Sequence, residues 1–221
     1  MQTVSDRKDR GRRGEAGFSL VELLVAIGVT LVIMVVATRL LAMSMFVRQR
    51  ENQRAEAVAD VQRALQAMSR EISNAGLGLS NNGLVADDSD DTSIRIRSNL
   101  NAICTTNLAC DSDTADAGED VVYAIISDTD DTGVVQRLIT RQDINSGNAI
   151  SQLANRIDNL QFVYVKPDGT TTLNASQAQK VKITVTVTLR AVGKSGQPGY
   201  QPPSQTELVS EVVLRNLLLN N

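Results

Sequence analysis

Hydrophobic residues of this 221-residue chain are concentrated in one long run near its N-terminus. No charged residue occurs from Leu23 to Thr38, and Glu22 is the only one from Phe18 to Thr38. About 20 apolar residues suffice for a helix to cross the hydrocarbon core of a bilayer. The run therefore predicts one membrane-spanning helix.

The helical pattern continues beyond the apolar run. No Pro occurs before Pro167, and Gly76 is the first strong stop signal after the run. Apolar residues recur at intervals of three or four, which places them on one face of a helix. The pattern predicts a helix over residues 18–75, amphipathic over 48–75. Its core-facing stripe is expected to be Val58, Val61, Leu65, Met68, Ile72 and Ala75, with Arg54, Asp60, Arg63, Arg70 and Glu71 turned away.

After Gly76 the apolar period changes to two residues, which is the repeat of a β-strand. Residues 181–192 are the clearest case, because Val, Ile and Leu alternate there with Lys and Thr. Pro167-Asp168-Gly169 has the composition of a turn. Strands are expected over 93–98, 120–127, 134–141, 159–166, 181–192 and 206–216. The predicted fold class is α+β, with one long N-terminal helix packed on an antiparallel β-sheet.

Charged residues are distributed unevenly along the chain. Residues 1–17 hold five basic and three acidic side chains, whereas residues 76–221 hold 11 basic and 17 acidic, a net charge of -6. The basic cluster precedes the apolar run, so the positive-inside rule places residues 1–17 in the cytoplasm. The acidic C-terminal body is therefore expected on the other side of the membrane.

The composition excludes several functional classes. The absence of His rules out Ser-His-Asp catalysis and His-containing zinc sites, and two Cys cannot supply a four-thiolate zinc site. A formal charge of -3 and six aromatic residues argue against nucleic-acid contact. No Ser, Lys or carboxylate pair is marked as catalytic by its neighbours. We expect a protein that is not an enzyme and holds no cofactor.

The most specific signal is the junction between the charged leader and the apolar run. The segment Gly17-Phe18-Ser19-Leu20-Val21-Glu22-Leu23-Leu24-Val25-Ala26 resembles the prepilin signature of type IV pilins and type II secretion pseudopilins. The resemblance implies that a membrane prepilin peptidase cuts between Gly17 and Phe18 and methylates the new amine of Phe18. It also implies a cytoplasmic leader over 1–17, a transmembrane and assembly helix over 18–47, and a periplasmic pilin-like domain over 48–221.

Glu22 lies inside the expected membrane helix. An ionised carboxylate costs on the order of 2.5 kcal/mol or more in hydrocarbon, so such a residue is functional by default and needs a partner. Cleavage creates an α-amino group at Phe18, four residues earlier, on the same helix face or beside a neighbouring subunit. In the pilin family this pairing between subunits sets the axial register. The alternative is that Glu22 reaches the membrane interface.

Weaker signatures point to a subgroup. Residues 62–76, 156–164 and 214–216 resemble minor pilins of the PilW kind and J-type pseudopilins. The resemblance implies a minor type IV pilin that is held in the inner membrane, with its C-terminal domain in the periplasm, and assembled through its helix into a pilus or its priming or tip complex. The implied partners are other major and minor pilins, the prepilin peptidase, the inner-membrane assembly platform and the lipid bilayer.

Two alternative functions remain open. One is a J-type minor pseudopilin of a type II secretion system. The other is a secreted or anchored ligand-binding or calcium-binding protein, in which the apolar run is an ordinary signal peptide.

Two features of the exported loops bear on these alternatives. Cys104 and Cys110 enclose five residues, and a disulfide is expected there, with free thiols as the alternative. Asp128, Asp130 and Asp131 begin like a calcium-binding loop, but Ile139 stands at the twelfth position, where a bidentate Glu is needed. Solvated turns are therefore favoured over calcium, and no metal site is expected.

Overall fold

The computed structural model describes residues 17–101, 113–129, 133 and 135–218. The chain divides into two compact units, the first ending at Met45 and the second beginning at Phe46. All the strands lie in the second unit, together with the C-terminal part of the long helix.

The long helix α1 spans Leu20–Ser73. Its first turn is closed by Leu23 N–H, which donates to Ser19 O at 3.1 Å. At the other end, Ala75 N–H donates to Ile72 O at 3.1 Å, and Gly76 adopts a φ of +77°. A residue in this left-handed region ends a helix, and Gly adopts it without strain from a side chain. The helix is two residues shorter at each end than the predicted 18–75, and Gly76 lies in the turn that follows it, as expected of a stop signal.

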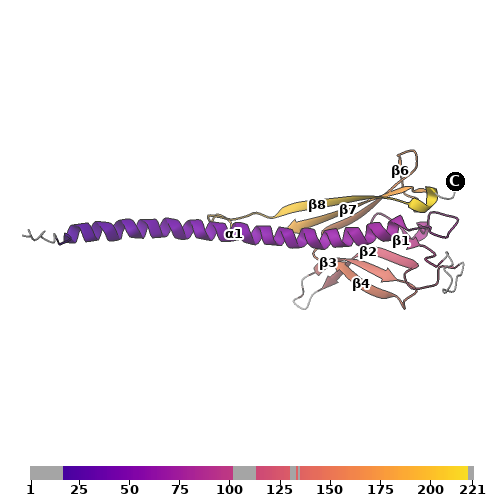
Figure 1. Ribbon diagram of the computed structural model, residues 1–221, viewed down its shortest axis with the longest axis horizontal. Coiled ribbons are helices and arrows are strands. Elements are labelled where there is room, and N and C mark those ends of the chain that lie inside the picture. Colours follow the sequence, from indigo (N-terminus) through magenta and orange to yellow (C-terminus); the bar gives the residue numbers. More distant parts are fainter. Residues whose placement is uncertain (1–16, 102–112, 130–132, 134, 219–221) are drawn as a thin grey trace, which may run out of the picture. The chain divides into compact units, whose positions relative to one another are not determined.

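The strands form two antiparallel sheets of four strands each (Figure 1). The first sheet has the order β1-β2-β3-β4, with β1 at Ser93–Arg97, β2 at Asp120–Thr129, β3 at Val135–Asp143 and β4 at Ala149–Ala154. The second has the order β6-β5-β7-β8, with β5 at Asn159–Val165, β6 at Thr171–Thr172, β7 at Lys180–Leu189 and β8 at Ser204–Val213. Short 3₁₀ turns cover Ala86–Asp88, Ala175–Gln177 and Arg215–Leu218.

The α+β class is confirmed, but the expected single sheet is two sheets. All six predicted strands are present, with ends shifted by up to three residues. The sequence analysis missed β4 and β6. The first four residues of β4 are all exposed, so its sequence shows no alternation, and β6 has only two residues.

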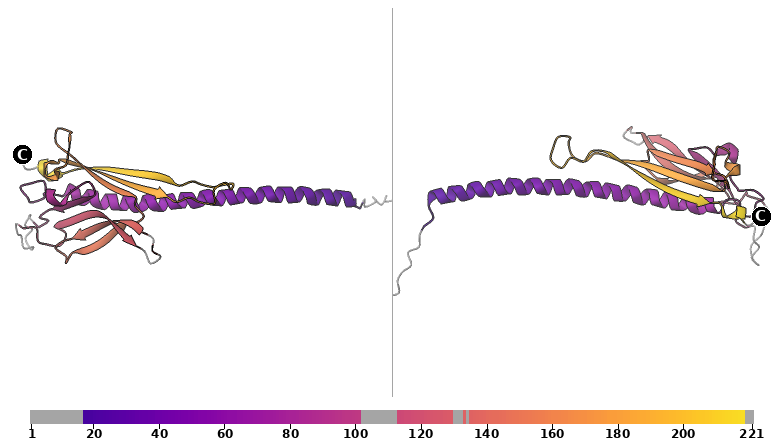
Figure 2. Two further views of the ribbon diagram at one scale, coloured as in Figure 1. Left: turned by 180° about the vertical axis from the view of Figure 1, so that it is seen from behind. Right: turned by 90° about the horizontal axis from the view of Figure 1, so that it is seen from above.

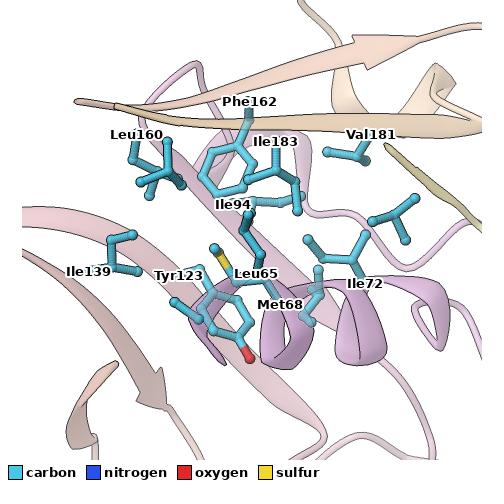
Figure 3. Packing of buried hydrophobic residues seen from close by; sticks show 14 of the residues in the cluster. Leu65, Met68, Ile72, Ile94, Tyr123, Ile139, Leu160, Phe162, Val181 and Ile183 are labelled. Atoms are coloured by element: carbon cyan, nitrogen blue, oxygen red, sulfur yellow. The ribbon is translucent and has the colours of Figure 1, made fainter. Parts of the chain in front are cut away.

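The core lies between the C-terminal part of α1 and both sheets. Leu65, Met68 and Ile72 of α1 face Ile94, Tyr123 and Ile139 of the first sheet and Leu160, Phe162, Val181 and Ile183 of the second (Figure 3). Figure 2 shows from two further sides that both sheets run along this part of the helix. The predicted stripe is confirmed from Val61 to Ala75, whereas Val58 is only half-buried. Along β7 the burial alternates at every residue, as the sequence predicts.

Candidate functional site

The residues of the predicted cleavage junction lie just before α1. Gly17, Phe18 and Ser19 precede its first residue, and the Phe18 side chain is 84% exposed. A Cβ atom added at Gly17 would meet no atom within 4 Å. The described junction is therefore sterically open, as access by another protein requires. The leader over residues 1–16 lies outside the described residues.

The N-terminal part of α1 is apolar on all sides. From Leu20 to Met45 its large hydrophobic side chains are exposed in the isolated chain, whereas Phe46 is half-buried. Within the described residues, α1 is the one helix that is long and apolar enough to cross a membrane. An exposed apolar surface of this extent is stable only in contact with lipid or with other apolar helices.

Three polar side chains interrupt this apolar surface between Leu20 and Thr38. Thr30 donates from Oγ1 to Ala26 O at 2.7 Å, and Thr38 donates to Met34 O at 2.6 Å, so both hydroxyls are satisfied within the helix. Glu22 forms no hydrogen bond or ion pair with any residue that the structure describes.

The N-terminal segment is similar to a known family. Residues 12–38 match the family described as the prokaryotic N-terminal methylation motif. The chain carries a type IV prepilin-like methylation motif. This methylation motif and the apolar helix together support a type IV pilin-like or pseudopilin-like prepilin that is anchored in a membrane. No curated protein matches the chain significantly.

The methylation motif covers the residues predicted from the prepilin resemblance. Gly17, Phe18 and Glu22 all lie within the matched range. The structure adds that the helix begins at Leu20, two residues after Phe18. The backbone nitrogen of Phe18 therefore precedes the helix.

The second half of α1 is tied to the first sheet by one carboxylate. Glu71 accepts a hydrogen bond from Tyr123 Oη at 2.8 Å, and the single Nε–H of Arg141 is shared between the two carboxylate oxygens of Glu71, at 3.0 and 3.1 Å. Burial, together with the charge of Glu71, raises the pKa of Tyr123 above its ordinary value, so the phenol stays a donor. The prediction that Glu71 turns away from the body is wrong, because its long side chain reaches back to β2 and β3.

Two of the segments singled out in the sequence, residues 62–76 and 214–216, meet in space at the end of α1. Asn216 Nδ2 donates to Asn74 O at 3.1 Å and to Ala75 O at 3.0 Å. These carbonyls follow the last helical turn, where such groups lack a partner within the helix. The C-terminal segment thus closes the helix end, a structural role that sequence spacing does not reveal.

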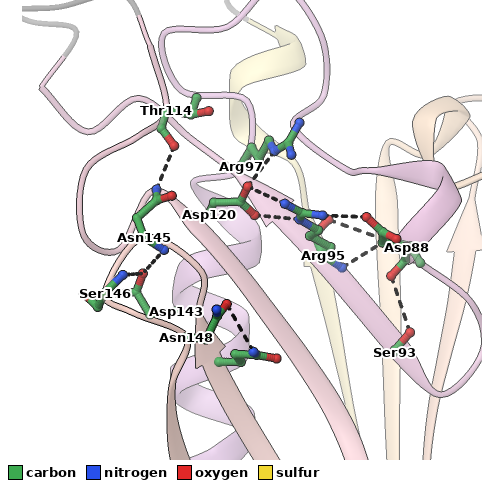
Figure 4. A network of polar contacts seen from close by, with 12 residues as sticks. Asp88, Ser93, Arg95, Arg97, Thr114, Asp120, Asp143, Asn145, Ser146 and Asn148 are labelled. Carbon is green, nitrogen blue, oxygen red and sulfur yellow. Dashed lines mark hydrogen bonds and ion pairs between the residues drawn. The ribbon is translucent and has the colours of Figure 1, made fainter.

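A cluster of charges joins β1 to β2 at the edge of the first sheet (Figure 4). Asp120 is 4% exposed and receives Arg95 Nε at 2.7 Å and Arg97 Nε at 2.8 Å, while Arg95 Nη1 also contacts Asp88 at 2.6 Å. Burial acts to raise the pKa of Asp120, but the hydrogen bonds from the two Arg outweigh it and hold the pKa below its ordinary value of 3.8.

Asp120→Asn is expected to destabilise the body by about 2 kcal/mol at neutral pH, because it leaves two half-buried guanidinium groups with a weaker acceptor. A pKa that is lower in the folded state stabilises the protein above about pH 4, and this stabilisation is lost as the pH falls through the lowered value. Urea unfolding between pH 2 and pH 7 should therefore show a smaller acid-induced loss of stability in the variant.

The matched control is Asp128→Asn, which removes an exposed carboxylate from the same strand. It should leave both the stability and its pH dependence nearly unchanged. Equal pH profiles for the Asp120 variant and the wild type would show that this cluster does not couple protonation to folding.

The remaining predicted site residues are only partly covered. Cys104, Cys110, Asp130 and Asp131 lie outside the described residues. Asp128 is an exposed residue of β2, and its carboxylate accepts the Thr129 N–H at 2.9 Å. Within the described residues, no three His, Cys, Asp or Glu side chains are grouped as metal ligands.

Proposed function

We propose that this protein is a minor type IV prepilin that is cut between Gly17 and Phe18, methylated at Phe18, and assembled through its apolar helix into a pilus or its priming complex. The observation that carries the proposal is the methylation motif at residues 12–38, which includes the start of a helix whose large apolar side chains are exposed from Leu20 to Met45. A secretory signal alone does not require a helix that continues into the core of the mature body, as α1 does.

Glu22 supports an assembly role for this helix. Both hydroxyls of the apolar segment are satisfied internally, whereas the Glu22 carboxylate has no partner within the described chain. In hydrocarbon such a group needs an opposite charge. The new amine of Phe18 supplies one. Because Phe18 precedes the helix, pairing with the Glu22 of a neighbouring copy is favoured over pairing within one chain.

The body then has a structural role. The C-terminal part of α1 contributes to the same hydrophobic core as both sheets. A force applied to this part of the helix is therefore transmitted to the body. We propose that the protein is a substrate of the prepilin peptidase and not itself an enzyme. Its C-terminal domain would lie in the periplasm, and its partners would be other pilins and the inner-membrane assembly platform.

Mass mapping of the protein from its native membrane tests the proposed processing. The mature chain is expected to begin with methylated Phe18. Gly17→Val is expected to reduce cleavage at least about a hundredfold, since a Cβ at the scissile position removes the freedom that Gly gives to the backbone. The uncut precursor should then accumulate in the membrane.

Gly14→Val is the matched control, because it makes the same change three residues earlier in the leader. It should be processed normally. A mature chain that begins near Met45 would instead identify an ordinary signal peptide, and normal processing of the Gly17 variant would rule out the assigned junction.

A further inference from the structure

The long connection between β7 and β8, residues 190–203, is tied to α1 by one side chain. We refer to it as the β7–β8 loop. The Arg50 guanidinium donates to Arg190 O at the start of the loop, and to Pro202 O and Ser204 Oγ at its end, both at 2.7 Å. Arg50 therefore holds both ends of the loop against the helix.

The middle of the loop is also ordered. Val192 and Gln201 exchange two backbone hydrogen bonds of 2.9 Å, and Val192 is only 2% exposed. A Cβ atom added at Gly193 would lie 3.9 Å from two ring carbons of Phe46, so the loop backbone passes directly over this ring. The loop is thus a small hairpin that passes Phe46 at Gly193, and its tip is formed by residues 194–199.

This attachment fixes the depth of the loop relative to a bilayer. The helix from Leu20 to Arg39 rises about 28 Å, close to the thickness of the hydrocarbon core. A second uncharged segment, Leu40–Val47, follows directly in the sequence. Phe46 lies about 10 Å beyond Arg39 along the helix, at or just beyond the outer edge of the headgroup region, which is about 5 to 7 Å thick. A loop that packs on Phe46 and Arg50 lies at the same level.

Basic residues outnumber acidic residues near this level, where Glu51 and Glu207 are the nearest acidic positions in the sequence. No acidic residue occurs between Glu22 and Glu51, nor in the chain from Arg190 to Thr206. The basic residues in these two segments are Arg39, Arg48, Arg50, Arg190 and Lys194, whereas residues 76–221 as a whole carry a net charge of -6. Positive charge is thus collected where the chain leaves the membrane, which complements an anionic lipid surface.

We propose that the β7–β8 loop is a second membrane contact, which lies on anionic lipid headgroups while α1 is in the bilayer. Arg190 and Lys194 are exposed and bind lipid phosphates, and Tyr200 occupies the interface, where aromatic residues with a polar end are favoured. The inference rests on the membrane-held state in the proposed function. The contact orients the body on the membrane and is lost when the helix leaves the bilayer.

The absence of Trp from the chain provides a direct test. Tyr200→Trp places a single fluorophore in the loop of the full-length protein. The variant is reconstituted into vesicles of phosphatidylglycerol and phosphatidylcholine in which some lipids carry bromine near the headgroup. Strong quenching and a blue-shifted emission are expected for Trp at this position. Because Tyr200 is half-buried, Gln197→Trp at the exposed tip serves as a second reporter.

Two further variants calibrate the measurement. Leu173→Trp lies at a position that is 95% exposed, next to β6, and should show little quenching. Val32→Trp lies in the apolar run and should be quenched by bromine deep in the bilayer. Absence of quenching at position 32 would overturn the membrane anchor and this inference together, whereas quenching at position 32 without quenching in the loop would overturn this inference alone.

Charge reversal tests the chemistry of the contact. Arg190→Glu with Lys194→Glu should lower the ratio of surface-bound to free loop at least about thirtyfold, since each basic residue contributes about a factor of five at an anionic surface. Vesicles of phosphatidylcholine alone, or high salt, should weaken quenching in the same direction. Lys166→Glu, in the β5–β6 turn, is the matched control and should have no effect.

A different partner would give a different result. If the loop reporter is unquenched in vesicles but becomes protected when subunits assemble, the loop is a contact between protein subunits and the lipid proposal is wrong. Unchanged quenching after charge reversal would likewise exclude anionic headgroups as the ligand.

Discussion

Gly83→Ala is expected to prevent the body from folding, or to lower its melting temperature by about 10 °C or more. Gly83 has a φ of +73°, and a Cβ atom there would lie closer than 3.0 Å to three backbone atoms, Gly76 N, Arg97 O and Ala75 C. All three are backbone atoms, so the clash cannot be relieved by the movement of a flexible side chain.

The three atoms mark the point where the end of α1 meets β1. Gly76 N–H donates to Arg97 O at 2.9 Å, and Arg97 N–H donates to Gly83 O at 2.7 Å. A methyl group on Gly83 would enter the space of the first of these bonds. The variant loses this hydrogen bond, acquires left-handed backbone strain and displaces neighbouring backbone. Together these effects lower the free energy of unfolding by at least about 4 kcal/mol, which is a large part of the stability of a typical domain.

Gly169→Ala separates backbone strain from the clash. Gly169 has a φ of +84°, but a Cβ atom there meets nothing within 4 Å. This control should lose about 1 to 2 kcal/mol, or a few degrees for a body of this size. Near-UV circular dichroism of the buried Tyr123 and Tyr164 follows the body without interference from the helix signal. Equal melting temperatures for the two variants would contradict the close packing at Gly83.

Features that depend only on residues adjacent in the chain could be predicted from the sequence. The apolar run and the leader junction are contiguous in the chain, and the strict alternation of β7 reflects one buried and one exposed face. The methylation motif was found for the same reason, since its residues are adjacent in sequence.

The features that the sequence analysis missed depend on contacts between distant segments. The helical periodicity assigned Glu71 to the solvent face, because periodicity considers only the direction of the Cα–Cβ bond. It does not show that the long Glu71 side chain extends back to Arg141. Arg50 contacts residues about 140 to 150 positions later in the chain, and the need for Gly at position 83 arises from its approach to β1. The division into two sheets likewise depends on which strands pair with each other, and the alternation of apolar and polar residues within a strand does not determine its partners.

Glu22→Ala is expected to reduce the fraction of the protein recovered in fibres at least about tenfold, while cleavage and methylation remain largely intact. The Glu22 carboxylate of one subunit is the proposed partner of the Phe18 amine of its neighbour. Without it, that amine is left unpaired among the apolar helices of the assembled fibre. An unpaired charge there costs on the order of 2.5 kcal/mol, which by itself corresponds to a factor greater than ten. Sheared fibres and membranes are compared by quantitative immunoblotting.

Thr30→Val and Thr38→Val provide matched controls within the same helix. Their hydroxyls bond to the backbone of their own helix, so their removal should leave assembly unchanged. Glu22→Asp keeps the charge on a shorter side chain and should retain part of the assembly that Glu22→Ala loses.

The direction of the Glu22 effect distinguishes pairing from simple membrane insertion. Removing a carboxylate from hydrocarbon should make the single helix more stable in the bilayer, by about the cost of burying that charge. If insertion alone limited assembly, Glu22→Ala would assemble as well as the wild type or better. Stronger retention in the membrane together with fewer fibres is therefore the specific signature of an amine and carboxylate that neutralise each other between subunits, and normal entry into fibres would refute that pairing.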